Sequence, residues 1–226
     1  MNNVHKKAWL ITLPRQVIWL FVILNIIAMF LYPSGTLRDN LSSGYSFTKN
    51  FLSDLGRSMT FSGEINFLSS LIFNIAMIIS GGALSLFYFK VRKVFNEDNQ
   101  KVLVLFGSFF GILGGVSIVG VGLAPADLYK DVHVLCANWI FRFMFVASIL
   151  YTVAIFRHPT FDNKYSGGYL VFAISILSYI LISEMGPGSE VSDFALLLQV
   201  VSQKMIFLIF MVAIYIQTIG IQKLLK

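Results

Sequence analysis

Six long apolar runs alternate with short polar segments along this chain. They fall at about residues 16–32, 66–89, 102–123, 133–156, 167–183 and 194–220. Each run is close to the roughly 20 apolar residues that a helix needs to cross about 30 Å of hydrocarbon. The pattern therefore predicts an all-α, polytopic membrane protein with six transmembrane helices.

Lysine and arginine are distributed unevenly between the two sides that six spans define. With the amino terminus placed in the cytoplasm, the inside segments hold eleven of these residues and the outside segments hold four. The other two, Arg142 and Lys204, fall within predicted spans. Because short loops rich in lysine and arginine stay on the cytoplasmic side, we expect both termini to be cytoplasmic. We expect a multi-pass protein of the cell membrane, such as a bacterial inner membrane.

Composition excludes two other classes of protein. Hydrophobic residues make up 57% of the chain and charged residues only 12%, whereas soluble domains are about 25% charged. The net charge of +6 does not indicate nucleic-acid binding, because the basic residues form no dense patch. We therefore expect membrane lipids as partners, and no nucleic acid. No polar stretch is long enough to fold alone, so residues 1–226 should form a single six-span domain.

The longest connection runs from Pro33 to about Ile65 on the predicted outer side. Four apolar residues in it recur at helical spacing with polar residues between them: Phe47, Phe51, Leu52 and Leu55. This pattern predicts a short amphipathic helix in the first external loop, lying on or dipping into the outer leaflet.

The second span carries a polar stripe. Asn66, Ser70 and Asn74 follow one another at intervals of one helical turn. Because amide side chains in hydrocarbon seek partners, this face should point into the bundle. Interhelical hydrogen bonding and ligand binding are both open as its role.

The third span carries a stripe of small residues, Gly107, Gly111 and Gly115, at four-residue spacing. Small residues at this interval let another helix backbone approach closely. The partner helix could belong to the same chain or to a second copy, so a homo-oligomer through this face is one possibility. A narrow groove for a lipid chain is another.

Acidic residues concentrate on the predicted outer face, and only Glu97, Asp98 and Asp162 remain inside. The densest outer cluster is the segment from residue 122 to residue 133, which contains Asp127 and ends at His133. These side chains could act in acid–base chemistry or bind a divalent metal. The spacing matches no recognisable zinc motif, so metal and cofactor content stay open. In a purely structural interpretation, Asp127 closes a turn and His133 is an interfacial residue bonded to a neighbouring carboxylate.

Two basic side chains lie deep in the predicted spans. Arg142 sits about nine residues into the fourth run and Lys204 about ten residues into the sixth. A charge at this depth costs several kcal/mol unless it is paired, hydrated or able to reach the interface. Either both are structurally paired, or they face a polar cavity that accepts an anionic group such as a lipid phosphate.

Two motifs carry a resemblance to a known family. The segment Asn50-Phe51-Leu52-Ser53-Asp54-Leu55-Gly56, together with Gly122 to Asp127 and His133, resembles the six-helix membrane family known as domain of unknown function 998. That family is more distantly similar to the Frag1/DRAM/Sfk1 membrane proteins, which hint at lipid handling. The resemblance implies a six-span bundle with functional residues on the non-cytoplasmic side. At matching positions these are Ser53, Asp54, Gly56, Asp127 and His133.

The sequence thus leads to one functional prediction and two alternatives. We predict an outward-facing polar pocket that binds or handles a lipid or other amphiphile. One alternative is a metal-assisted hydrolase of the outer leaflet with Asp54, Asp127 and His133 as catalytic candidates. The other is an ion- or proton-coupled transporter that uses Lys204 and Glu184. The predicted ligand-binding residues are Ser53, Asp54, Asn74, Asp127, His133, Asn138, Arg142, Gln203 and Lys204.

Overall fold

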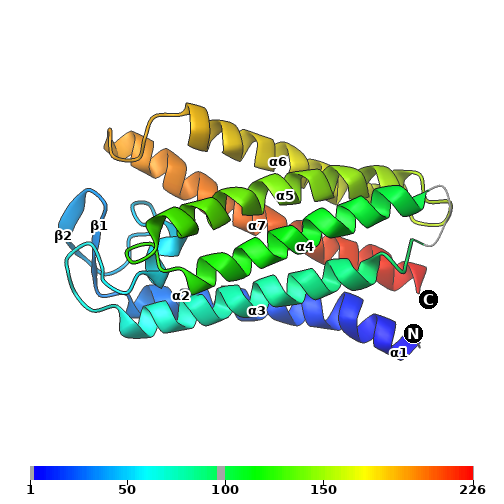
Figure 1. Ribbon diagram of the computed structural model, residues 1–226, viewed down its shortest axis with the longest axis horizontal. Helices are drawn as coiled ribbons and strands as arrows, with labels where there is room; N and C mark the ends of the chain where they lie inside the picture. Colours follow the sequence, from blue (N-terminus) through cyan, green and yellow to red (C-terminus); the bar gives the residue numbers. More distant parts are fainter. Residues whose placement is uncertain (1–2, 96–99, 226) are drawn as a thin grey trace.

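The computed structural model describes residues 3–95 and 100–225, and long helices dominate it (Figure 1). The first is continuous through α1 (Asn3–Lys7), the π-helical turn η1 (Ala8–Thr12) and α2 (Leu13–Leu31). The other long helices are α3 (Phe67–Val91), α4 (Lys101–Leu123), α5 (Lys130–Phe156), α6 (Ser166–Met185) and α7 (Asp193–Leu224). A short 3₁₀ turn, η4 (Asn163–Tyr165), precedes α6.

Six helices in the described ranges are long and apolar enough to cross a membrane. This confirms the predicted number and order of spans. The helix ends depart from the apolar runs by a few residues, because polar and charged residues such as Lys130 and Lys223 continue the helices beyond the apolar segments. Glu97 and Asp98, which the sequence places on the cytoplasmic side, lie outside the described residues.

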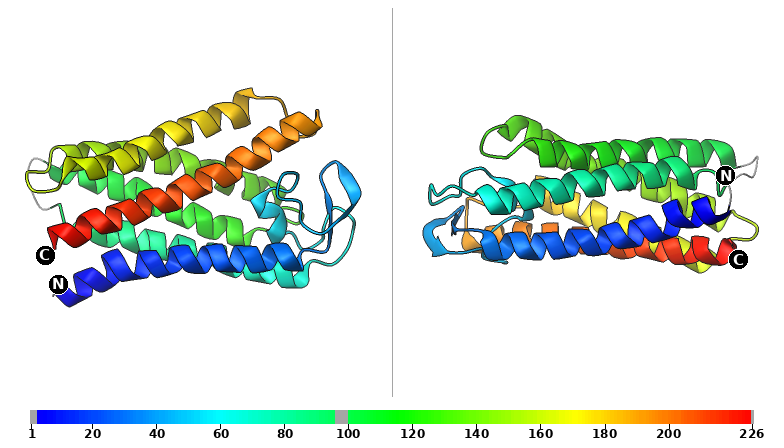
Figure 2. Two further views of the ribbon diagram at one scale, coloured as in Figure 1. Left: turned by 180° about the vertical axis from the view of Figure 1, so that it is seen from behind. Right: turned by 90° about the horizontal axis from the view of Figure 1, so that it is seen from below.

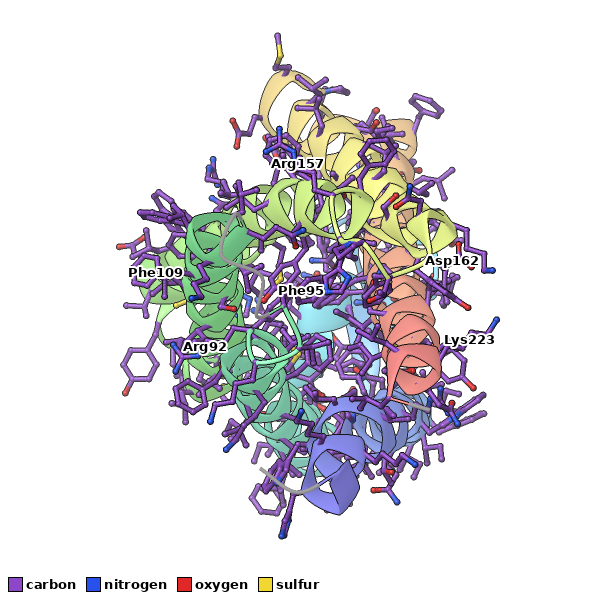
Figure 3. The ribbon with its side chains drawn as sticks, turned by 90° about the vertical axis from the view of Figure 1, so that its right-hand side faces the viewer. Arg92, Phe95, Phe109, Arg157, Asp162 and Lys223 are labelled. Atoms are coloured by element: carbon purple, nitrogen blue, oxygen red, sulfur yellow. The ribbon has the colours of Figure 1, made fainter. Side chains whose placement is uncertain are left out.

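The long helices run alongside one another (Figure 2). Each packs against its neighbours in the sequence, and together they form a ring (Figure 3). The ring runs from α2 through α3, α4, α5 and α6 to α7, and the contact of α7 with α2 is the least extensive. Seen end-on in Figure 3, Phe95 points into the ring and Phe109 points away from it. The interior is filled largely by buried aromatic and aliphatic side chains.

Both termini lie at the same end of the bundle (Figure 1). Arg92, Arg157 and Lys223 lie at that end too (Figure 3). The predicted topology requires the termini and these basic residues to lie at one end, the cytoplasmic one. The side of the membrane that each end faces stays a prediction. The opposite end, which carries residues 32–66, is called the loop end below.

The glycine stripe of α4 packs against other helices of the same chain. A Cβ atom on Gly107 would meet the Tyr151 ring of α5, and one on Gly111 would meet the Tyr88 ring of α3. One on Gly115 would lie 2.7 Å from the Gly81 carbonyl oxygen of α3. The three glycines are therefore covered within the chain and are not free to contact a second copy.

Residues 32–66 fold into an irregular cap over the loop end of the ring. Two short strands, β1 (Ser34–Thr36) and β2 (Asp39–Ser43), pair antiparallel. The chain then turns into η2 (Leu52–Gly56), a 3₁₀ turn that packs chiefly on α3 and also touches α2 and α7.

The predicted amphipathic helix on the outer leaflet is therefore wrong. Only one 3₁₀ turn forms, and Leu52 and Leu55 are buried in the bundle, whereas Phe47 is exposed. The apolar spacing reflects burial between helices, which sequence periodicity alone does not distinguish from burial in lipid.

Candidate functional site

The segment from Asn50 to Gly56 is inserted into the bundle and tied down by its own side chains. The Asn50 amide nitrogen donates to the Gly35 carbonyl at 3.0 Å and to Asp54 Oδ2 at 3.3 Å. Asp54 Oδ2 also accepts a hydrogen bond from the Phe51 amide at 2.8 Å. Asn50 is completely buried and Asp54 is only 5% exposed. This segment therefore holds a carboxylate inside the protein.

The polar stripe of α3 fastens this segment in place. Asn66 donates to the Leu55 carbonyl at 3.0 Å, and the Ser70 hydroxyl donates to the Gly56 carbonyl at 3.1 Å. Asn74 donates to Ser70 Oγ at 3.1 Å. The stripe thus points into the bundle, as predicted. Gly56 leaves room for this packing, because a Cβ atom there would lie 2.5 Å from the Phe73 ring.

Two consecutive residues of α7 hold the segment from the other side. Gln203 Oε1 accepts a hydrogen bond from the Leu52 amide at 2.8 Å. Lys204 Nζ donates to the Asn50 carbonyl at 2.5 Å and lies 5.4 Å from the Tyr45 ring centroid. Lys204 is only 8% exposed. Its ammonium group is thus engaged by the loop.

Burial dominates the electrostatics of Asp54. Loss of solvation raises its pKa from 3.8 to about 6, and the nearby charges of Arg57 and Lys204 offset only part of this effect. Hydrogen bonds from Asn50 and Phe51 act in the same direction as these charges. Asp54 therefore changes its protonation state close to neutral pH.

Asp127 lies in the turn between α4 and α5 and binds the loop. Its carboxylate accepts hydrogen bonds from the Ser58 and Met59 amides, each at 2.9 Å, and from the Ser58 hydroxyl. Burial opposes ionisation, but these bonds outweigh it and hold the pKa of Asp127 below its usual value. The carboxylate therefore joins the loop to the α4–α5 turn.

Replacing Asp127 by alanine should destabilise the protein by about 2 kcal/mol, because three donors lose a charged acceptor. The contribution of Asp127 is present above its unfolded pKa and is lost as pH falls through its lower folded pKa. Thermal unfolding of the purified protein measures the loss. Asp131→Ala is the matched control, because Asp131 is exposed at the same end. Equal losses in the two variants would contradict this role.

His133 lines a small cavity at the loop end, which is called the polar cavity below because three of its otherwise apolar lining residues are polar. The cavity has a volume of about 20 Å³, and its lining includes Ser53, His133 and Gln203, so it has space for about one water molecule. His133 Nδ1 lies 2.7 Å from the Ala124 carbonyl oxygen. The remaining lining residues are Leu52, Phe73, Met77, Val121, Ala137, Ile140, Phe141 and Phe207.

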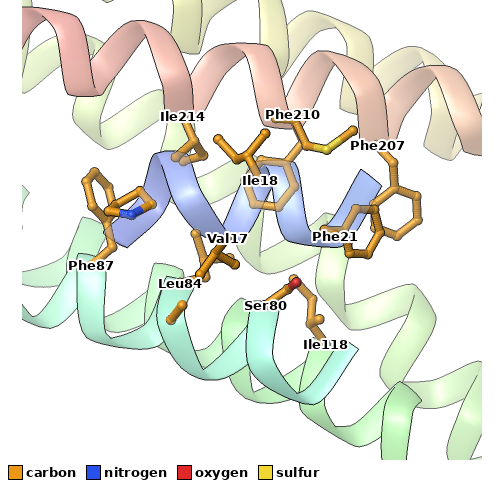
Figure 4. Close-up of a pocket in the computed structure, with 13 residues that line it drawn as sticks. Val17, Ile18, Phe21, Ser80, Leu84, Phe87, Ile118, Phe207, Phe210 and Ile214 are labelled. Atoms are coloured by element: carbon orange, nitrogen blue, oxygen red, sulfur yellow. The ribbon is translucent and has the colours of Figure 1, made fainter. Parts of the chain in front are cut away.

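A larger apolar groove, of about 70 Å³, lies between α2, α3 and α7 (Figure 4). Ser80 is the one polar side chain in its lining. Arg15 lies next to this lining and links α2 to α7, donating to Thr218 at 2.8 Å and to Gln222 at 2.9 Å. The groove is lined by Pro14, Val17, Ile18, Phe21, Ser80, Ala83, Leu84, Phe87, Ile118, Phe207, Phe210, Met211 and Ile214.

The polar cavity and the apolar groove are stacked along the same helices. Both are lined by residues of α3: Phe73 lines the cavity and Phe87 lines the groove. These two residues are about 21 Å apart along the helix axis, at 1.5 Å per residue. Phe207 lines both the cavity and the groove, and its ring lies 6.2 Å from that of Phe21 and 5.7 Å from that of Phe141. Phe207 thus lies between the polar cavity and the apolar groove.

Two predicted ligand residues lie away from this site. Arg142 forms an ion pair with Glu184 of α6, and the two side chains are 35% and 47% exposed. Asn138, one turn earlier on α5, is exposed on the bundle surface. The two deep cations therefore do not face a common space: Arg142 pairs with α6, and Lys204 with the loop.

The three catalytic candidates are also held in separate arrangements. Asp54 caps η2, Asp127 accepts from Ser58 and Met59, and His133 contacts Ala124. Within residues 3–95 and 100–225, no three His, Cys, Asp or Glu side chains gather as a metal ligand set would. Likewise, Glu184 and Lys204, the pair named for a transporter, contact different partners.

Phe207 and the apolar groove were not predicted from the sequence. A phenylalanine in a transmembrane run carries no sign of whether it faces lipid or the bundle interior, because both environments are apolar. Gln203 was found because an amide in hydrocarbon requires a partner.

A family model described as a protein of unknown function, DUF998, matches residues 26–216. No curated protein and no solved structure matches the chain significantly. The match covers α3, α4, α5 and α6 completely, α7 up to residue 216 and the end of α2. It also includes the loop and the residues that line the polar cavity. The chain therefore belongs to the DUF998 family, as the two loop motifs indicated.

Proposed function

We propose that this protein binds a single-chain amphiphile of the cell membrane, with the hydrocarbon chain along the apolar groove. Its polar end would point to the loop end, which the basic residues orient outward. Membrane lipids are then its partners.

One observation carries this proposal: the polar cavity and the apolar groove adjoin at Phe207 within the ring. This order, polar at the loop end and apolar from the middle toward the end that carries the termini, matches an amphiphile whose polar end is near the membrane surface. The stack extends about 21 Å along α3, which is roughly two thirds of the hydrocarbon thickness.

The contact between α2 and α7 offers a route for the chain from the bilayer. This contact is the least extensive in the ring, and the groove lies directly beside it. At about 70 Å³, the groove accepts part of a hydrocarbon chain with its present side-chain positions. The rest of the chain would lie against the bilayer-facing sides of α2 and α7.

Filling the groove should remove bound amphiphile. Ala83→Phe places a ring in the groove, whereas Leu86→Phe places the same ring on the exposed face of the same helix. Mass spectrometry of purified protein should find about one amphiphile per chain in the wild type and in Leu86→Phe. The Ala83→Phe variant should retain less than about a tenth of it, since an overlapping ring excludes the chain.

Two results would reject the proposal. The first is a wild-type protein that carries no amphiphile. The second is equal retention in Ala83→Phe and Leu86→Phe. Melting temperatures of both variants, measured in the same detergent, distinguish a blocked groove from an unfolded protein.

A further inference from the structure

Three side chains that line the polar cavity carry hydrogen-bonding groups to which no residue in the described part of the chain bonds. They are the Ser53 hydroxyl, the second ring nitrogen of His133, Nε2, and the amide nitrogen of Gln203. Other atoms of two of these side chains are already fixed: Gln203 Oε1 by the Leu52 amide and His133 Nδ1 by the Ala124 carbonyl. Two of the three groups are thus held in place, and the Ser53 hydroxyl is free to rotate toward a ligand.

The fixed contacts decide what each group can do. A carbonyl oxygen only accepts, so His133 Nδ1 carries the hydrogen that bonds to Ala124, and in the neutral ring Nε2 is an acceptor. Gln203 Nε2 is a donor, because its amide oxygen is the atom that faces Leu52. The Ser53 hydroxyl can donate or accept. The cavity thus offers donors and acceptors together.

Four charged groups near the loop end are directed to residues that do not line the cavity. Arg57 donates to the Met59 carbonyl at 3.1 Å. Lys204 donates to the Asn50 carbonyl, and Arg142 pairs with Glu184. The Asp127 carboxylate accepts from Ser58 and Met59. Among the described residues that line the cavity, none is a lysine, an arginine or a carboxylate. A phosphate placed there would be buried with no lysine or arginine of the cavity lining to contact it, which is unfavourable.

We infer that the polar end of the bound amphiphile is an uncharged hydroxyl group, held by Ser53, His133 and Gln203. This inference rests on the proposed function. The volume of about 20 Å³ suits one hydroxyl-sized group. The class of ligand is thus a neutral amphiphile, such as a monoacylglycerol or a long-chain alcohol, and phosphate-bearing lipids are excluded from the cavity.

Two probes with the same chain test this inference. They are 1-monooleoylglycerol and 1-oleoyl lysophosphatidic acid, which differ by one phosphate group. Their affinities for the full-length protein in detergent can be measured by titrating each probe in native mass spectrometry. We expect monooleoylglycerol to bind at least about tenfold more tightly, because the phosphate finds no cation.

Each outcome has a distinct meaning. Equal binding of both probes, or tighter binding of lysophosphatidic acid, overturns the neutral polar site but leaves chain binding in the groove intact. Binding of neither probe overturns the proposed function as well. Weakening of both probes by Ala83→Phe would show that the chain occupies the groove.

Ser53→Ala examines the polar site without breaking a contact of the fold, since no residue in the described ranges bonds to the Ser53 hydroxyl. Loss of one hydrogen bond should weaken monooleoylglycerol binding about fivefold and leave the melting temperature of the ligand-free protein unchanged. Ser178→Ala, on the exposed face of α6, is the control and should bind as the wild type does. Unchanged binding in Ser53→Ala would overturn the inference.

Discussion

Replacing Gly81 by alanine should lower the free energy of unfolding by about 2 kcal/mol, although it adds only one methyl group. At Gly81 the backbones of α3 and α4 are in contact. A Cβ atom there would lie 2.5 Å from the Gly115 carbonyl oxygen and 2.8 Å from the Val119 amide nitrogen. Both are backbone atoms, so no change of rotamer relieves the overlap. The helices must separate, and close packing is a main source of helix association in membranes.

Gly82 provides a matched control on the same helix. Nothing lies within 4 Å of a Cβ atom at that position, so Gly82→Ala should be neutral or slightly stabilising through its higher helix propensity. Thermal unfolding in detergent should place the Gly81→Ala variant roughly 5 °C below the wild type and the Gly82→Ala variant at or above it. Equal melting temperatures for the two variants would contradict the backbone contact between α3 and α4.

The helices could be predicted from the sequence because crossing hydrocarbon imposes a strong constraint on each segment. A run such as residues 102–123 must hydrogen-bond its own backbone and present apolar side chains all round, so its length and composition suffice. The stripe of Asn66, Ser70 and Asn74 could be oriented for the related reason that amides require partners.

The loop end could not be predicted in the same way, because its structure depends on contacts distant in sequence. Leu52 is positioned by Gln203, and Ser58 by Asp127, and no local pattern encodes either pairing. Leu52 and Leu55 therefore resembled a surface helix although they are buried. The family motifs indicated the family but not how their residues are arranged.

Contacts distant in sequence also give Arg142 and Lys204 different environments. At the level of sequence, Arg142 and Lys204 have equal depth and equal charge. In the structure, Arg142 reaches Glu184 at the partly exposed edge of α5 and α6, whereas Lys204 is enclosed by the loop. A shared anion site required them to converge, and they do not.

Asp54 makes the importance of Lys204 depend on pH. The pKa of Asp54 is about 6 in the folded protein and 3.8 without burial, so folding favours its protonated form. This contribution to stability is fully present below pH 3.8 and is lost as pH rises through about 6. At pH 7 Asp54 is therefore mostly ionised inside the protein, and the nearby charge of Lys204 lowers the cost of that ionisation.

Replacing Lys204 by methionine should therefore destabilise the protein by about 2 kcal/mol at pH 7, because Asp54 loses a neighbouring cation and the Asn50 carbonyl loses a hydrogen bond. At pH 5, where Asp54 is largely protonated, the loss should fall to about 1 kcal/mol, the value of the hydrogen bond to the Asn50 carbonyl. Adding Asp54→Asn to Lys204→Met should remove this pH dependence, since an amide does not titrate. Denaturant unfolding of the wild type and of both variants at pH 7 and pH 5 measures these losses of stability.

Arg142→Met is the matched control for this prediction, because it removes the same charge from a partly exposed ion pair. Such a pair contributes at most about 1 kcal/mol, so the loss should be small at both pH values. If Lys204→Met and Arg142→Met had equal effects at pH 7, Lys204 would not be acting through Asp54. A loss in Lys204→Met that stayed the same at pH 5 would likewise assign its role to the Asn50 hydrogen bond alone. The predicted difference depends on burial, which separates two cations that the sequence presents as equivalent.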